Sequence, residues 1–100
     1  RLLPKRKAWF YKTHGDAFGK SGIPDIIISY RGVFVTLEVK RHNGGKQSEL
    51  QKYHQQEIRK SGGICEFITD VTQVEELLDF LDDCEKEILE FQIYHYNNRK

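Results

Sequence analysis

Three side chains that together could hydrolyse a phosphodiester, Asp25, Glu38 and Lys40, lie in two strand-like runs. The only turn signal between the runs is Arg31-Gly32, which fits a hairpin with a loop of about two residues. In that register Asp25 lies directly opposite Glu38, and directly paired side chains point to one face of a sheet. Lys40, two residues along the same strand, points to that face as well. Because adjacent carboxylates repel unless a cation lies between them, the pattern predicts a metal site for phosphodiester cleavage.

The two faces of the predicted hairpin, residues 23–41, differ in character. The same register places Tyr30 opposite Val33. The face opposite the acids is almost wholly apolar and is predicted to form the core, with Pro24, Ile26, Ile28, Tyr30, Val33, Val35, Leu37 and Val39 on it. A slip of one residue would drive the acids into that core, so the register is well specified. The simpler alternative is a solvated polar surface with an ordinary Glu38–Lys40 ion pair, but pairing with Asp25 favours a functional cluster.

Composition places the chain among small folded proteins. Its 100 residues are 38% hydrophobic and 12% aromatic, which predicts a single domain over residues 1–100. No apolar run approaches the ~20 residues that a membrane helix needs, and no signal-peptide pattern opens the chain, so we expect an intracellular, cytoplasmic protein. Cys65 and Cys84 lack metal-ligand spacing and are expected to be free thiols; a disulfide is the less favoured alternative.

Other kinds of active site find little support in the sequence. The four histidines show no zinc-ligand spacing, and Ser48 has no evident histidine and acid partners for covalent catalysis. No phosphate-cradling glycine motif is present, so no nucleotide cofactor is expected. Hydrolysis by a metal-activated water is the chemistry that the remaining residues favour.

Charge is distributed unevenly along the chain. Residues 1–60 carry 13 Lys or Arg and 5 Asp or Glu, a net charge of +8, whereas residues 61–100 carry a net charge of −7. A basic half that contains the candidate site suits a polyanionic substrate. The run Lys5-Arg6-Lys7 could contact a phosphate backbone, as could Lys20 in a glycine-rich loop over residues 14–22. Ordinary solvated surfaces are the alternative explanation for such runs.

The remaining elements follow from capping and periodicity. Residues 8–13 predict a short strand, or the tail of an upstream helix, and residues 64–69 predict a strand parallel to the one that carries Glu38. Ser48 and Gln51 form a capping box that opens a helix over 48–60, and Thr72 is predicted to open an acidic helix over 72–90. Residues 91–96 are ambiguous between strand and helix. The expected fold is α/β, a mixed sheet in the order β-β-β-α-β-α with flanking helices.

Apolar periodicity predicts which helical side chains are buried. In the first helix these are Leu50, Tyr53 and Ile58, with His54 as a further candidate. In the second helix the apolar face comprises Val74, Leu77, Leu78, Leu81, Cys84 and Ile88.

Several short motifs together resemble a known family. The segments are Gly22-Ile23-Pro24-Asp25, Glu38-Val39-Lys40, Gly45-Lys46-Gln47-Ser48-Glu49-Leu50-Gln51 and Gly62-Gly63. Their order and spacing over about residues 20–80 resemble the VRR-NUC domain of the PD-(D/E)XK nuclease superfamily, most closely its small stand-alone versions from phages and bacteria. The resemblance implies a restriction-endonuclease-like sheet core.

The resemblance also implies roles for individual residues. Asp25 and Glu38 match the metal-binding acids, with the backbone carbonyl of Val39 as a third oxygen ligand, a set that suits Mg²⁺ or Mn²⁺. Lys40 matches the lysine that orients the attacking water, and Gln51 matches a glutamine that helps to position the lysine or the water. The basic residues expected to contact nucleic acid are Lys5, Arg6, Lys7, Lys20, Arg41 and Lys46.

The implied activity is that of a divalent-metal-dependent DNA endonuclease, acting as a homodimer on branched DNA such as four-way junctions. A flap, nick or restriction-like nuclease is an alternative within the same class. A non-catalytic nucleic-acid-binding module and a purely structural or interaction protein are alternatives outside it. The family usually has a further acid on a preceding helix, and since residues 1–15 contain no Asp or Glu, we expect that acid upstream of Arg1.

Overall fold

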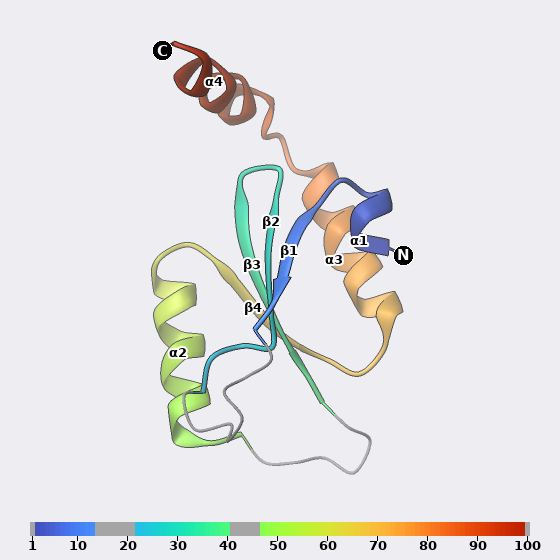
Figure 1. Ribbon diagram of the computed structural model, residues 1–100, viewed down its shortest axis with the longest axis vertical. Helices are drawn as coiled ribbons and strands as arrows, with labels where there is room; N and C mark the ends of the chain where they lie inside the picture. The colour runs from blue at the N-terminus through green and yellow to red at the C-terminus, as the bar shows by residue number, and fades with distance from the viewer. Residues whose placement is uncertain (1, 14–21, 41–46, 100) are drawn as a thin grey trace.

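A four-stranded mixed sheet lies at the centre of the computed structural model, which describes residues 2–13, 22–40 and 47–99. The strands are β1 (Trp9–Lys12), β2 (Ile26–Tyr30), β3 (Val33–Val39) and β4 (Ile64–Ile68), in the order β1-β2-β3-β4. The helices are α1 (Leu2–Lys5), α2 (Glu49–Lys60), α3 (Val71–Asp83) and α4 (Glu87–Asn98) (Figure 1). The predicted α/β class and element order are confirmed, with β4 parallel to β3 and the other pairs antiparallel. The short helix α1 was not predicted.

The predicted hairpin register is confirmed. Tyr30 pairs with Val33 and Ile28 with Val35, so the loop consists of Arg31 and Gly32 alone. Both loop residues have left-handed backbone, with φ of 51° and 82°, as a type I′ turn requires. The register continues as far as Ile26 opposite Leu37. The next pair along would be Asp25 and Glu38, so the turn geometry sets the two acids side by side.

The core lies on the predicted face of the hairpin. Ile28, Tyr30, Val35 and Leu37 are buried against α3, which contributes Val74, Leu78 and Leu81. Fully burying an aliphatic side chain of this size stabilises the fold by about 1.5–3 kcal/mol. Packing of this face against α3 therefore fixes the orientation of the sheet, so the opposite face, which carries the two acids, points away from α3.

Helix α2 covers part of the opposite face, which buries Thr36 and Glu38 more deeply than the sequence predicted. Arg59 donates a hydrogen bond of 2.8 Å to the carbonyl of Cys65, which ties α2 to β4. The predicted helical stripe was wrong in part, since Leu50 and Tyr53 are exposed. The half-buried side chains of α2 are spaced three and four residues apart and so lie on one face of the helix. This face is more polar than the predicted one and consists of Gln51, His54, Gln55 and Ile58.

The end of the chain differs from the single helix predicted over 72–90. Asp70, rather than Thr72, is the N-cap of α3, and its carboxylate accepts from the N–H of Thr72 while Gln73 completes a capping box. The helix ends at Asp83, with no basic residue in its last turn, where acidic side chains oppose the helix dipole. A separate helix, α4, then follows; it includes residues 91–96 and projects away from the sheet and α3 (Figure 1). Ile88, predicted to be buried, is 77% exposed.

Among the described residues, no helix has the length and apolar character needed to cross a membrane.

Candidate metal centre

Asp25 is fixed at the point where three strands meet. Its Oδ2 accepts a hydrogen bond of 2.8 Å from the backbone N–H of Val39, at the end of β3. Its main-chain carbonyl accepts from the N–H of Thr13 at 2.9 Å, just beyond β1. The carboxylate is therefore held against the strand that carries Glu38, and only one of its oxygens is engaged by this bond.

Glu38 is a carboxyl group that is buried next to another carboxyl group. Its side chain is 5% exposed. Burial, together with the negative charge of Asp25, raises the pKa of Glu38 to about 7, although Lys40 acts in the opposite direction. A cation between the two acids would offset both the burial of the Glu38 charge and its repulsion by Asp25.

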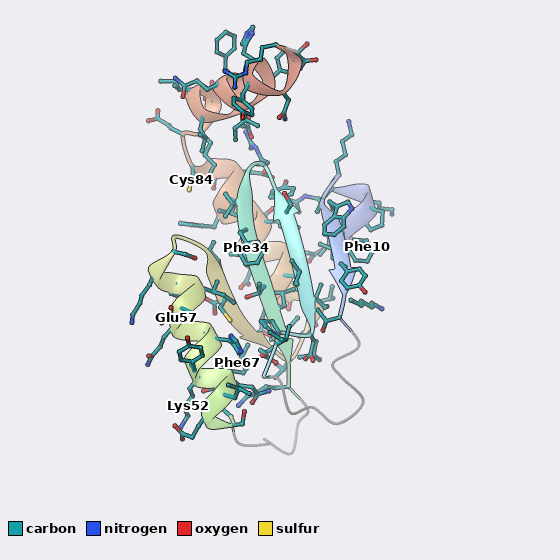
Figure 2. All side chains as sticks on the ribbon, turned by 60° about the vertical axis from the view of Figure 1, so that its left-hand side comes forward. Phe10, Phe34, Lys52, Glu57, Phe67 and Cys84 are labelled. Atoms are coloured by element: carbon teal, nitrogen blue, oxygen red, sulfur yellow. The ribbon has the colours of Figure 1, made fainter. Side chains whose placement is uncertain are left out.

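Lys40 lies on the same side of the sheet as Glu38. Its Nζ is 4.7 Å from the centre of the Phe67 ring, and Phe67 is the residue paired with Glu38 in the parallel β3–β4 register. Figure 2 shows Phe67 beside α2. The backbone N–H of Lys40 donates to the carbonyl of Ile68 at 2.8 Å, which continues the sheet ladder past the end of β3. Phe67 was not predicted as a contact of Lys40, although the pairing of the strands could have indicated it.

Gln51 occupies the capping position predicted for it. Its side-chain oxygen accepts from the N–H of Ser48 at 2.8 Å, while its own N–H donates to the Ser48 hydroxyl at 3.0 Å. A role for Gln51 in catalysis remains a prediction.

Gly22 brings the start of α2 close to the candidate metal centre, a contact that the motifs did not predict. Gly22 has φ of +69°, and a Cβ there would lie 2.7 Å from the carbonyl carbon of Leu50 and 2.8 Å from the nitrogen of Gln51. The chain that leads into Asp25 thus passes against the first turn of α2.

The donor set fits a hard divalent cation. Asp25 and Glu38 offer carboxylate oxygens, and the predicted third ligand, the Val39 carbonyl, is an oxygen as well, which is the chemistry that Mg²⁺ and Mn²⁺ prefer. Within the described part of the chain, no group of three or more His, Cys, Asp or Glu side chains is placed to hold a metal. The acid pair would therefore supply two side-chain ligands.

The predicted nucleic-acid contacts separate into three groups. Lys5 and Lys7 are exposed. Arg6 instead bonds to Asp79 at 3.0 Å and Asp82 at 2.8 Å of α3, which raises its pKa, so its guanidinium is directed to the core side of the sheet. Lys20, Arg41 and Lys46 lie outside the described residues.

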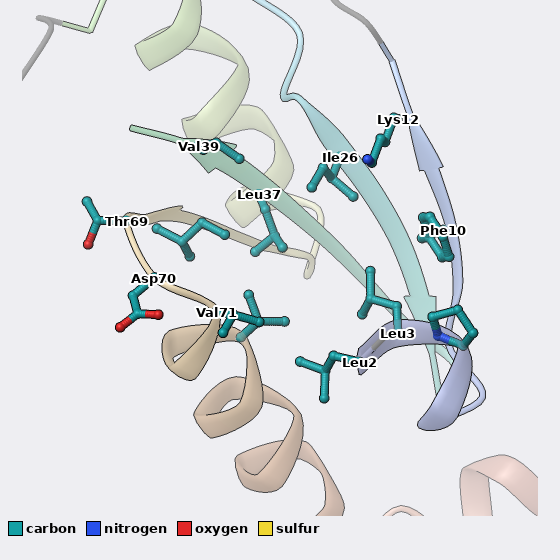
Figure 3. A pocket seen from close by; sticks show the side chains of 13 residues that line it. Leu2, Leu3, Phe10, Lys12, Ile26, Leu37, Val39, Thr69, Asp70 and Val71 are labelled. Carbon is teal, nitrogen blue, oxygen red and sulfur yellow. The ribbon is translucent and has the colours of Figure 1, made fainter. Parts of the chain in front are cut away.

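A separate apolar pocket of about 330 Å³ lies on the core side, next to α1 and the start of α3 (Figure 3). Leu2, Leu3, Phe10 and Leu37 are among its lining residues. The acids and lysine of the candidate metal centre do not line it, so it is a different region of the molecule.

Comparison with solved structures found a match described as a VRR_NUC domain. The two chains superpose with a TM-score of 0.60 and are 26% identical, over 77% of this chain and 82% of the other. The chain has a VRR-NUC-like fold. This confirms the resemblance inferred from the motifs, and the VRR-NUC fold implies the PD-(D/E)XK nuclease superfamily, whose members are generally metal-dependent. No protein-family model and no curated protein matches the chain.

Proposed function

We propose that this chain is a divalent-metal-dependent endonuclease that hydrolyses phosphodiester bonds in DNA. The observation that carries the proposal is the opposed pair of Asp25, just before β2, and Glu38, near the end of β3. Glu38 is buried beside a second negative charge, and Lys40 lies on the same side of the sheet. A protein that only bound DNA would gain little from adjacent acids that repel phosphate.

Each residue has a distinct role in the proposed reaction. Asp25 and Glu38, with the carbonyl of Val39, would hold Mg²⁺ or Mn²⁺, which when bound supplies an activated water and offsets negative charge on the phosphate. The Lys40 ammonium would orient the water and stabilise the charge that develops on phosphorus and its oxygens. Gln51, at the N-terminus of α2, would help to position the lysine or the water at a helix end that favours anions.

The preferred substrate in this proposal is branched DNA, including four-way junctions, cut by a homodimer inside the cell. Two-fold symmetry would match paired cuts in a junction. The basic character of residues 1–60, with exposed Lys5 and Lys7, supports a polyanionic substrate. Residues 1–100 form one nuclease domain in this view. A flap, nick or restriction-like specificity is the alternative within the class.

A labelled substrate panel tests the proposal. It contains duplex, single strand, flap and four-way junction, each incubated with Mg²⁺, with Mn²⁺ and with EDTA, and the products are resolved on denaturing gels. We expect internal cuts only in the presence of metal, and most rapidly in the junction.

The panel also distinguishes the alternatives. Faster cutting of the flap than of the junction would change the proposed substrate preference but would leave the nuclease proposal intact. Binding of every substrate without any metal-dependent cut would favour a non-catalytic module on the same fold.

A further inference from the structure

Among the described residues, α2 packs against β4 on the sheet face that carries the candidate metal centre. Two aromatic side chains of β1 remain open to solvent on this face, with Trp9 63% and Tyr11 57% exposed, and Phe34 of β3 is 47% exposed. Trp9 pairs with Ser29 and Tyr11 with Ile27, and paired residues share a face. Asp25, Ile27 and Ser29 are spaced two residues apart, so their side chains point to one face of the sheet. Trp9 and Tyr11 therefore lie on the same face as Asp25 and Glu38.

The rings of Trp9 and Tyr11 are nearly parallel, and their centroids are well separated. Their planes differ by 11° and their centroids are 6.5 Å apart. That separation reflects the two-residue repeat of a strand and is close to twice the ~3.4 Å spacing of stacked bases. One base between them would contact a ring on each side. Because β1 is at the edge of the sheet, the gap can be reached from the side.

The Trp9–Tyr11 pair lies within a few nucleotides' length of the candidate metal centre. Tyr11 is one cross-strand row from the Asp25–Glu38 row, about 7 Å along the sheet, and Trp9 is about 13 Å away. A base held between them would lie about 10 Å from Asp25, or roughly three stacked nucleotides. A strand bound in this way could pass its next phosphates into the centre.

We propose that Trp9 and Tyr11 form a stacking site for an unpaired base of the nucleic-acid strand that is cut. The inference rests on the proposed nuclease function and favours, among the proposed branched substrates, those with unpaired nucleotides next to the cut. Bases in a continuous duplex are already stacked on their neighbours and cannot enter the gap. Aromatic stacking contributes affinity without reading sequence.

The test uses Trp9 as its own reporter, because it is the single tryptophan of the chain. In EDTA, which prevents cutting, the protein is titrated with an oligo-dT strand and with a closed duplex that has no unpaired nucleotides. We expect oligo-dT to quench and shift the tryptophan emission to saturation, and the duplex to leave it nearly unchanged. Tyr11→Ala should weaken oligo-dT binding by about 5- to 100-fold, as loss of one stacking partner does.

Phe80→Ala is the matched control. Phe80 is 61% exposed, but it belongs to α3 on the other side of the sheet, so its removal should leave oligo-dT affinity unchanged. Equal effects of Tyr11→Ala and Phe80→Ala, or an emission spectrum indifferent to oligo-dT, would overturn the stacking site. So would an emission shift that follows protein concentration alone, since that result would place Trp9 in a contact between two copies.

Failure of the stacking site and failure of the nuclease proposal give different results. Metal-dependent cutting with no response of Trp9 removes the stacking site and keeps the nuclease. Quenching by oligo-dT that depends on Tyr11, without cutting of any substrate, keeps the stacking site and removes the nuclease. If both hold, cuts should map within about three nucleotides of an unpaired segment.

Discussion

At the scale of single residues, the Glu38 carboxyl group is in an electrostatic conflict that its neighbours do not resolve. It is buried, it lies next to Asp25, and the two effects together raise its pKa to about 7. Lys40 offsets only part of this. A single substitution of one acid by its amide would remove the repulsion between the two carboxylates. The presence of both acids is therefore best explained by a ligand that needs both charges.

The raised pKa of Glu38 predicts how stability depends on pH. Between pH 4.5 and about 7 the folded protein retains a proton that the unfolded chain releases, so the free energy of unfolding falls as pH rises through this range and then levels off. Glu38→Gln should remove this fall and, in EDTA at pH 8, stabilise the protein by roughly 2–3 kcal/mol. At pH 4 the two proteins should be nearly equal.

Urea denaturation of both proteins at pH 4, 6 and 8 checks this expectation. Added Mg²⁺ should stabilise the wild type but not Glu38→Gln, because only the wild type keeps both acidic ligands. Parallel stability curves for the two proteins across pH would contradict the assigned environment of Glu38.

Lys40 is expected to act in catalysis rather than in DNA affinity. Lys40→Ala should lower the cleavage rate by about 100- to 1000-fold, as loss of one group that stabilises developing charge does, while the Kd for DNA in EDTA changes little. Lys52→Ala is the control, since Lys52 is an exposed lysine on α2 that pairs with Glu49. Rates are compared under single-turnover conditions. An equal loss of cutting and binding in Lys40→Ala would show that Lys40 only attracts DNA.

At the scale of elements, the close approach of Gly22 to α2 sets where Asp25 lies. Gly22 and Gly62 both have positive φ, so alanine is strained at either position, but a Cβ at Gly62 meets nothing within 4 Å. Comparison of the two alanine variants therefore separates the effect of backbone strain from the effect of the contact with α2. Gly22→Ala requires the backbone at Leu50 and Gln51 to shift.

We expect Gly22→Ala to lower the free energy of unfolding by at least 1–2 kcal/mol more than Gly62→Ala does. It should also lower the cleavage rate more than tenfold, because Asp25 follows three residues later. Thermal denaturation and single-turnover rates measure the two effects. If both alanine variants behave alike, the contact between Gly22 and α2 does not position the site.

Local patterns predicted much of this arrangement, and longer-range contacts explain what they did not predict. The Arg31-Gly32 turn and the apolar alternation around it were enough to derive the hairpin register and the opposition of the two acids. The exposure of Leu50 and Tyr53 could not be read from helical periodicity, because the rotation of α2 depends on its contacts with β4 and Gly22. Likewise, Asp70 caps α3 in preference to Thr72 since its carboxylate reaches an N–H two residues ahead.

At the scale of the whole molecule, α4 makes the shape elongated, with principal extents of 45 × 27 × 22 Å. Arg31 at the hairpin turn connects it to the body through hydrogen bonds to Glu90 of α4 and Asp82 of α3, both at 3.1 Å. Exposed apolar side chains are found along its length: Ile88, Leu89, Phe91, Ile93, Tyr94 and Tyr96. A helix with so much exposed apolar surface supports the proposed homodimer, with α4 as its contact surface.

The dimer proposal predicts that Phe91→Ser shifts the chain toward monomer. Phe91 is 64% exposed, so the substitution removes little packing within one chain and should leave the melting temperature of the monomer nearly unchanged. Sedimentation equilibrium over a range of protein concentrations measures the change. Phe80→Ser, at a similarly exposed position on α3, should leave association unchanged; a wild type that remains monomeric throughout would reject α4 as a dimer contact.

The proposal as a whole depends on Asp25 and Glu38 binding a divalent cation together. The most direct measurement is a calorimetric titration of the protein with Mn²⁺ at pH 8, repeated with Glu38→Gln and with Glu66→Gln, an exposed glutamate on β4, as control. The prediction is a saturable site in the wild type and in Glu66→Gln that weakens at least tenfold in Glu38→Gln. Equal Mn²⁺ binding by all three proteins, or no saturable binding in the wild type, would contradict the metal centre.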